Sequence, residues 1–369
     1  MSDTTQGVPF DARALTEPVD PADAKAFAAE LSRRHPRTST AAVLGVVAVV
    51  AVALVLVVVG GGVLFAVGAL IADGSANAGG LIPLIGAAII GGGLVWAVAA
   101  YLRAQRVRRY RLDRFARANG MSYLPAQSTP ARPGMIFGLG HSRRAEDILR
   151  GEAPRFAEFA NYEYTTGSGK HKTTHRWGYV AIRLDAPLPH IVLDATGNNS
   201  VFGSNLPVGF RRDQRLSLEG DFDEHFALYC PEGYEQDALY LFTPDIMARF
   251  LDHAGQLDVE IVDDWMFLYT RRKVTTLDPA TWAWLFSVVG ALIGKLDQWG
   301  RWRDDRLTGA LRPVAAGVAP ALSAAPALTP PRGVAAPGRR LRRRFPWLVL
   351  VAVIAGVAFF VLDVLGSGG

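Results

Sequence analysis

The sequence predicts an α+β domain, built on a mostly antiparallel sheet with helices, that is attached to three transmembrane helices. Residues 41–72 and 81–102 contain no charged side chain, and residues 345–365 contain only Asp363. A helix needs about 20 apolar residues to cross a bilayer, so we expect an N-terminal transmembrane hairpin and one C-terminal span. In residues 151–305, strand-like alternation between Gly- and Pro-rich turns predicts the sheet.

Arginines gather at the ends of the apolar runs. One group directly follows the second run, and another directly precedes the third. Because basic flanks stay on the cytoplasmic side, the pattern predicts a multi-pass protein of the cell membrane. Its N-terminus and central domain would be cytoplasmic and its C-terminus outside, with the anionic inner leaflet as a partner of the arginines. The flanking set is Arg103, Arg106, Arg108, Arg109, Arg339, Arg340, Arg342, Arg343 and Arg344.

Composition defines the remaining segments. Residues 1–40 are expected to form an N-terminal segment with one short helix, which Asp20 can cap and Pro21 can begin. Residues 103–150 are predicted to be a juxtamembrane helix and a connector. Residues 306–344 are rich in Ala and Pro and then in Arg, and they are predicted to be a linker.

An aromatic hairpin is the clearest element of the α+β domain. Predicted strands over residues 156–165 and 173–184 flank a tip that contains Gly167 and Gly169. A second hairpin is predicted over residues 259–270. Both favour a sheet in which neighbouring strands run antiparallel.

Residues 279–294 are apolar nearly all round. A run of this length is borderline for crossing a bilayer. A crossing would also place the C-terminal arginines outside, against the rule for basic flanks. We therefore expect a helix that packs on the core or lies at the membrane interface.

The charge is unevenly divided along the chain, which has a formal net charge of +5 and a pI near 9.4. Residues 103–114 and 339–344 each contribute a net +5, which leaves −5 for the rest. The basicity is therefore assigned to the membrane flanks, and nucleic acid is not expected as a partner. The single cysteine, Cys230, excludes an intrachain disulfide.

The sequence contains no P-loop, no dinucleotide-binding fingerprint and no nucleophile elbow. His171 and His175 are four residues apart, but on a strand they would lie about 13 Å apart, too far to share a metal ion. We therefore expect no catalytic, cofactor-binding or metal-ligating residue. One alternative is a membrane-associated hydrolase that uses the acids Glu219, Asp221 and Asp223.

A set of acidic and aromatic motifs lies in the second half of the domain. They are residues 218–223 (LEGDFD) with Phe226 and Tyr229, then residues 238–240 (ALY) and 243–247 (TPDIM). With the aromatic hairpin, this run resembles a bacterial, actinobacterial-type family of integral membrane proteins that share a cytoplasmic domain of unknown function. The resemblance spans about residues 150–272. It implies the architecture of the domain and brings no catalytic residue.

Together these features favour a membrane-anchored binding or scaffolding domain without catalytic activity. Its partner would be another protein, or a second copy that associates through the transmembrane helices. The tip of the aromatic hairpin is the best candidate for the contact. The candidate contact residues are Tyr164, Lys170, His171, His175 and Trp177.

Overall fold

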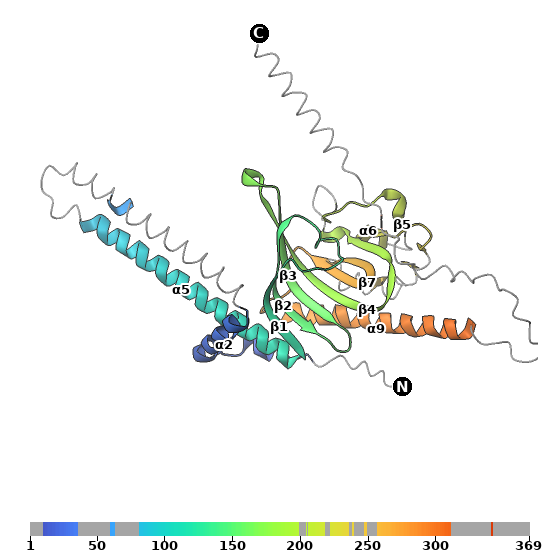
Figure 1. Cartoon of the computed structure of the whole chain (residues 1–369), viewed down its shortest axis with the longest axis horizontal. Helices are drawn as coiled ribbons and strands as arrows, with labels where there is room; N and C mark the ends of the chain where they lie inside the picture. Colours follow the sequence, from blue (N-terminus) through green and yellow to red (C-terminus); the bar gives the residue numbers. More distant parts are fainter. Residues whose placement is uncertain are drawn as a thin grey trace, which may run out of the picture.

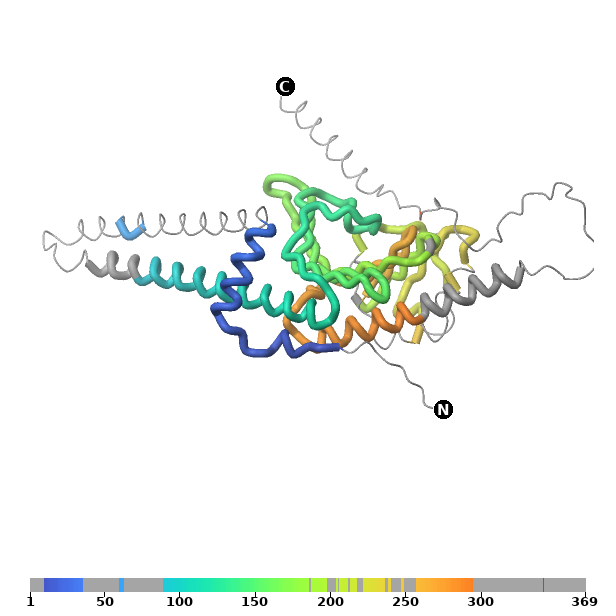
Figure 2. The backbone as a smooth tube through the Cα atoms, turned by 60° about the horizontal axis from the view of Figure 1, so that its bottom comes forward, coloured from blue at the N-terminus to red at the C-terminus, as the bar shows by residue number. Residues whose placement is uncertain are grey.

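A computed structural model shows an antiparallel sheet with two long helices, α5 (Leu81–Ala118) and α9 (Pro279–Ala310). In Figure 1, α9 runs beneath the sheet, while α5 meets the sheet only at its C-terminal end and extends beyond it. Figure 2 shows the short helix α2 (Pro21–Arg34) crossing α5. The structure describes residues 10–35, 60–62, 81–198, 204, 206–217, 222–235, 238–239, 247–248, 257–310 and 341.

The described strands form one seven-stranded sheet in the order β1-β2-β3-β4-β6-β5, and β7 also pairs with β4. Every described pair of strands is antiparallel. The strands are β1 (Met121–Ser128), β2 (His141–Gly151), β3 (Ala157–Thr166), β4 (Thr173–Ala195), β5 (Arg215–Leu216), β6 (Phe226–Tyr229) and β7 (Asp258–Thr270). The α+β class and the antiparallel sheet predicted from the sequence are confirmed. The hairpin predicted over residues 259–270 is wrong, because these residues lie in the single strand β7, which pairs with β4.

Strand β4 connects the two halves of the sheet. Its first part pairs with β3, its last four residues pair with β6, and β7 follows it along most of its length. The register between β4 and β7 shifts between Arg183 and Ile191. Pro187 and Pro189 lie in this interval and have no N–H to donate to the ladder, so the ladder is interrupted there.

One face of the sheet is covered by α9 and the C-terminal part of α5. Asp278 caps α9 by accepting two backbone N–H groups at 3.2 and 3.0 Å. One turn later, Trp282 is fully buried, with its ring 4.7 Å from Phe115 of α5 and 5.6 Å from Phe159 of β3. Residues 279–294 therefore pack on the core, which is one of the two placements that the sequence left open.

The second face of the sheet is covered by residues 129–140, which connect β1 to β2. Phe137 of this connection packs on aromatic rings from three strands, at centroid distances of 4.9 Å from Tyr162, 5.0 Å from Tyr179 and 5.5 Å from Phe267. Such ring pairs contribute beyond the area that they bury. Each face of the sheet thus has its own hydrophobic core.

Arg108 of α5 is a structural residue rather than a membrane-flanking one. It forms an ion pair with Asp147 of β2 and donates from Nη2 to the carbonyl oxygen of Thr275 at 2.9 Å. These contacts tie α5 to the sheet and to the segment before α9. Of the other predicted flanking residues, Arg103 and Arg106 are exposed and Arg109 is half-buried, whereas Arg339, Arg340, Arg342, Arg343 and Arg344 lie outside the described residues.

The prediction of three transmembrane helices is wrong. Among the residues that the structure describes, no helix is both long and apolar enough to cross a bilayer. The second predicted span, residues 81–102, forms the first part of the longer helix α5. Residues 345–365, and residues 41–72 apart from 60–62, lie outside the described part.

The same finding overturns the predicted location. The sequence pointed to a multi-pass protein of the cell membrane, with its N-terminus and central domain cytoplasmic and its C-terminus outside. That assignment rested on apolar runs flanked by arginines. In α5, the apolar run continues without a break into an arginine-rich part that packs on the sheet domain, so a flanking arginine there is not evidence of a membrane boundary.

The burial of Trp282 predicts a large stability cost for Trp282→Ala. We expect a loss of about 3–5 kcal/mol in the free energy of unfolding, measured by urea denaturation, because the change removes a fully buried ring. Trp284→Ala on the same helix is the matched control, since Trp284 is only partly buried, and it should cost about 1–2 kcal/mol. Equal losses would show that α9 does not pack in the described orientation.

Candidate functional site

The β3–β4 hairpin projects beyond the rest of the sheet and ends in a short 3-10 turn, Gly169–His171 (Figure 1). Gly167 and Gly169 have φ angles of +74° and +54°, which favour glycine. At Gly167, a Cβ atom would also collide with the carbonyl oxygen of His171. The two glycines therefore allow the tight reversal, and the predicted hairpin is confirmed.

The structure divides the five predicted contact residues into two groups. Tyr164 and Trp177 are core residues, 3% and 2% exposed. His175 stacks on Tyr164 at 4.8 Å, and its Nε2 lies 2.8 Å from the hydroxyl of Thr166. Lys170 and His171 are exposed at the tip. Only these two of the five are therefore fully open to a partner.

The end of β7 brings a second cationic segment beside the hairpin. Arg271, Arg272 and Lys273 follow β7 directly and are exposed. Their backbone turns back over β4 at Gly178, where a Cβ atom would collide with the carbonyl oxygen of Arg272 and lie 2.6 Å from Val274 Cγ1. The absence of a side chain at residue 178 therefore allows this turn to lie against the sheet.

The side chain of Asn161 in β3 holds the residues that directly follow this cationic segment. Its Oδ1 accepts the N–H of Val274 at 2.9 Å, and its Nδ2 donates to the hydroxyl of Thr275 at 2.6 Å. All three residues are buried. An amide side chain satisfies both a donor and an acceptor of the crossing backbone, so it holds the segment that carries the cations.

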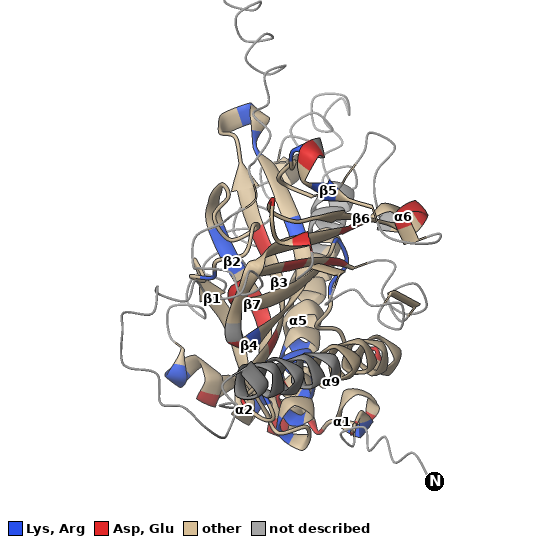
Figure 3. Cartoon of the chain, turned by 90° about the vertical axis from the view of Figure 1, so that its right-hand side faces the viewer, with Lys and Arg blue, Asp and Glu red and all other residues tan. Residues whose placement is uncertain are grey.

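Strand register adds a third source of charge, the start of β2. Arg144 pairs with Glu163 of β3, and Glu163 pairs with Arg176 of β4. We call the resulting surface the basic end. Its cations are Arg143, Arg144, Lys170, Lys172, Arg176, Arg271, Arg272 and Lys273. Figure 3 shows Lys/Arg at the tip of the projecting hairpin.

The basic end contains two carboxylates, and both have cationic partners. Glu163 lies 3.8 Å from Arg176, and Glu146 lies 3.1 Å from Arg144. The guanidinium of Arg271 lies over the Trp177 ring at 3.6 Å, and its partial burial there lowers its pKa, although the residue as a whole is exposed. The surface thus carries eight Lys/Arg against two Glu.

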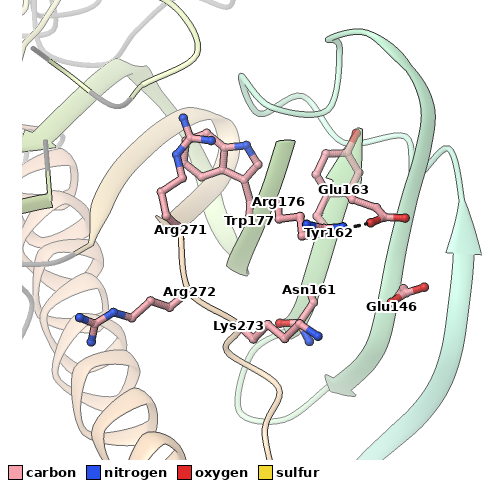
Figure 4. Close-up of a pocket in the computed structure, with 9 residues that line it drawn as sticks. All are labelled: Glu146, Asn161, Tyr162, Glu163, Arg176, Trp177, Arg271, Arg272 and Lys273. Atoms are coloured by element: carbon pink, nitrogen blue, oxygen red, sulfur yellow. Dashed lines mark ion pairs between the residues drawn. The ribbon is translucent and has the colours of Figure 1, made fainter. Parts of the chain in front are cut away.

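A small pocket of about 60 Å³ lies within the basic end (Figure 4). Asn161, Glu163 and Arg176 form part of its wall, and Lys273 lies beside Asn161. In the same view, Arg272 points away from this group. The cations are therefore spread over a surface and do not converge on one point.

The acidic cluster of the hydrolase alternative is only partly described. Glu219 and Asp221 lie outside the described residues. Asp223 lies in α6 (Phe222–His225) and accepts a hydrogen bond from the hydroxyl of Ser217. Within the described part of the chain, no three His, Cys, Asp or Glu side chains are placed to hold a metal ion.

Two buried glutamates, Glu158 and Glu260, hold the 129–140 connection on the second face by accepting hydrogen bonds from Arg132 and from the N–H of Met135. Glu158, 1% exposed, accepts hydrogen bonds from Tyr179 Oη at 2.7 Å and from Arg132 Nη2 at 2.9 Å. Burial alone would raise the pKa of Glu158. The Tyr179 hydroxyl and the guanidiniums of Arg132 and Arg150 have the opposite effect and prevail, so the pKa lies below its ordinary value.

Comparison with known proteins gives little independent guidance. No family model matches the chain, and no curated protein matches it. A solved structure, the crystal structure of the mycobacterial trehalose monomycolate transport factor A, TtfA, aligns at 12% identity with a TM-score of 0.35. The alignment covers 51% of this chain and 93% of that one. Similarity at this level supports no conclusion about fold or function, and the resemblance to a bacterial membrane family stays a prediction.

Asn161→Ala should loosen the cationic segment. It leaves the buried N–H of Val274 without its acceptor, and we expect a loss of about 1–3 kcal/mol in the free energy of unfolding. Trypsin should also cut faster after residues 271–273 in native conditions. Thr276→Ala is the control, because its hydroxyl makes only an exposed bond of 3.3 Å to Asp278 N. Unchanged cleavage in Asn161→Ala would contradict the role given to this amide.

Glu158→Gln should change the response of stability to acid. The lowered pKa means that Glu158 contributes stability above its unfolded-state value, near 4.5, and that this stability is lost as the pH falls through the folded-state value. We expect the variant to be less stable by about 1.5–3 kcal/mol at pH 7. The gap should narrow toward pH 3, as measured by urea denaturation at each pH. Exposed Glu152→Gln is the control, and a constant gap would contradict the assignment.

Proposed function

We propose that this chain is a binding module that engages an acidic segment of a partner protein through its basic end. The observation that carries the proposal is the gathering of eight Lys/Arg and two Glu from three separate segments on one end of the sheet. A cluster of one sign attracts an oppositely charged partner and accelerates its encounter.

The exposed cations of this surface support recognition rather than internal structure. Lys170, Lys172, Arg272 and Lys273 are exposed and form no ion pair with another described residue. Their backbone is nevertheless held in place, by the hairpin ladder for the lysines of the tip and by Asn161 for the segment after β7. A rigid backbone lowers the entropy cost of presenting long, flexible side chains.

Two features favour a protein over a bilayer or a nucleic acid. The exposed large apolar side chains of the described residues lie on α5 and at Leu239, with none at the basic end, so this end offers no wedge for acyl chains and no open ring for stacking on bases. Glu146 and Glu163 stand among the cations. An acidic protein segment can also carry a cation that pairs with Glu146 or Glu163, whereas the backbone of a nucleic acid carries none.

The proposal keeps the binding role expected from the sequence. It does not use a membrane anchor, and of the five predicted contact residues it keeps only Lys170 as part of the basic end. The hydrolase alternative receives no support from the described residues. Asp223 is half-buried in the short helix α6 and accepts a hydrogen bond from Ser217. Scaffolding of a larger assembly would use the same surface, since one acidic segment would suffice to recruit the domain.

Charge reversal at the basic end tests the proposal. The triple variant Lys170→Glu, Arg272→Glu, Lys273→Glu should weaken binding of a fluorescein-labelled poly-glutamate peptide at least tenfold, by a rough estimate from exposed charge pairs. The measurement is fluorescence anisotropy at about 50 mM salt, and binding should weaken further at about 300 mM.

The control carries the same charge change elsewhere. Lys25→Glu, Arg33→Glu, Arg34→Glu alters three exposed residues of α2 and should leave the affinity within about twofold at high salt, because charges beyond a Debye length are screened. Equal losses in both variants would overturn the proposal. So would tighter, reversal-sensitive binding to vesicles that contain phosphatidylserine or to duplex DNA.

A further inference from the structure

A residue near the C-terminal end of the chain is buried on the second face of the sheet. Leu341 is 5% exposed and belongs to the second hydrophobic core, with Phe210 and Val262. Its backbone N–H donates to Nδ1 of His190 at 3.2 Å, across 151 residues of sequence. It stands in the sequence RRLRRR, residues 339–344, so one apolar residue among five arginines is taken into the domain.

The partners of His190 determine which of its nitrogens carries the proton. Nε2 lies 2.9 Å from Oε1 of Glu260, which is 1% exposed and whose other oxygen accepts Tyr269 Oη at 2.7 Å and Met135 N at 2.6 Å. A carboxylate only accepts, so Nε2 of the neutral imidazole is the donor. Nδ1 is then an acceptor, as the N–H of Leu341 requires.

We propose that this part of the second face is a binding site for the chain's own arginine-rich segment, with Leu341 as the anchor. The site binds two groups of Leu341. The apolar side chain is buried in the core that contains Phe210, and the backbone N–H donates to Nδ1 of His190.

The chain between α9 and Leu341 suits a reversible attachment. Residues 311–337 are rich in Ala and Pro, a composition that gives a spacer without a core of its own. A tethered segment binds at a high effective concentration, so a small set of contacts is sufficient to hold it. The same small set allows a competing segment to displace it.

Two measurements on the full chain test the site. In the first, hydrogen exchange followed by mass spectrometry reports the amides of residues 339–344. We expect Leu341→Ala to exchange about five- to tenfold faster than wild type, the effect of losing about one hydrogen bond and its packing. Leu239→Ala, at an exposed leucine, is the control and should leave these amides unchanged.

A variant of the acceptor gives the second arm of the exchange experiment. His190→Phe removes the nitrogen that accepts the N–H of Leu341 and should also make these amides exchange faster. His171→Asn, at the exposed hairpin tip, should leave them unchanged. Unchanged protection in His190→Phe would contradict the role of His190.

The second measurement places the segment in trans. A fluorescent peptide of residues 336–346 should bind the Leu341→Ala chain at least about tenfold more tightly than the wild type, whose site is already occupied in cis. Equal binding to both chains, or to neither, would overturn the site. Protection in the wild type that depends on protein concentration would overturn the intramolecular assignment and indicate exchange of the segment between copies.

Discussion

The antiparallel ladder between β4 and β7 is the constraint on which the rest of the structure depends. It places Gly178 opposite Thr270 and so fixes where the chain leaves the sheet. From that point Arg271–Lys273 must cross the end of β4, and only a residue without a side chain lets them pass. At the other end of the ladder, Leu193 pairs with Val259, which sets His190 and Glu260 side by side. Both proposed surfaces therefore follow from one register.

Buried charge gives the second face its specificity. An isolated carboxylate in a core would cost several kcal/mol, yet Glu158 and Glu260 are each 1% exposed. Each is compensated by hydroxyl, guanidinium, imidazole or backbone donors. Because the donors come from the connection between β1 and β2 as well as from strands, the glutamates select one position of that connection. Apolar packing alone would allow it to shift along the sheet.

The parts of the fold that the sequence predicted are those with strong local signals. The aromatic alternation and the pair Gly167 and Gly169 predicted β3 and β4, and the apolar pattern of residues 279–294 predicted the helix α9. Strands β1 and β2 were not predicted and lie in residues 103–150, which were assigned to a helix and a connector. Pro125 interrupts the strand pattern of β1, and charged residues obscure that of β2. Their stability comes from pairing with β3 and with each other, which no local pattern records. The transmembrane assignment for residues 81–102 considered the apolar run alone. It did not show that the same helix, α5, continues to Ala118 and packs on the sheet.

The basic end could not be predicted from the sequence, because segments that are far apart in the chain form it. Outside the two arginine clusters the charges sum to −5, and this sum was taken to exclude a basic surface. A partner, however, responds to charges within about one Debye length, roughly 8–10 Å, and not to the sum over a segment. Residues 143–144, 170–176 and 271–273 are each modest in charge and far apart in sequence. The register of β2, β3, β4 and β7 brings these segments to one end of the sheet, so the local charge there depends on the topology and cannot be read from the composition.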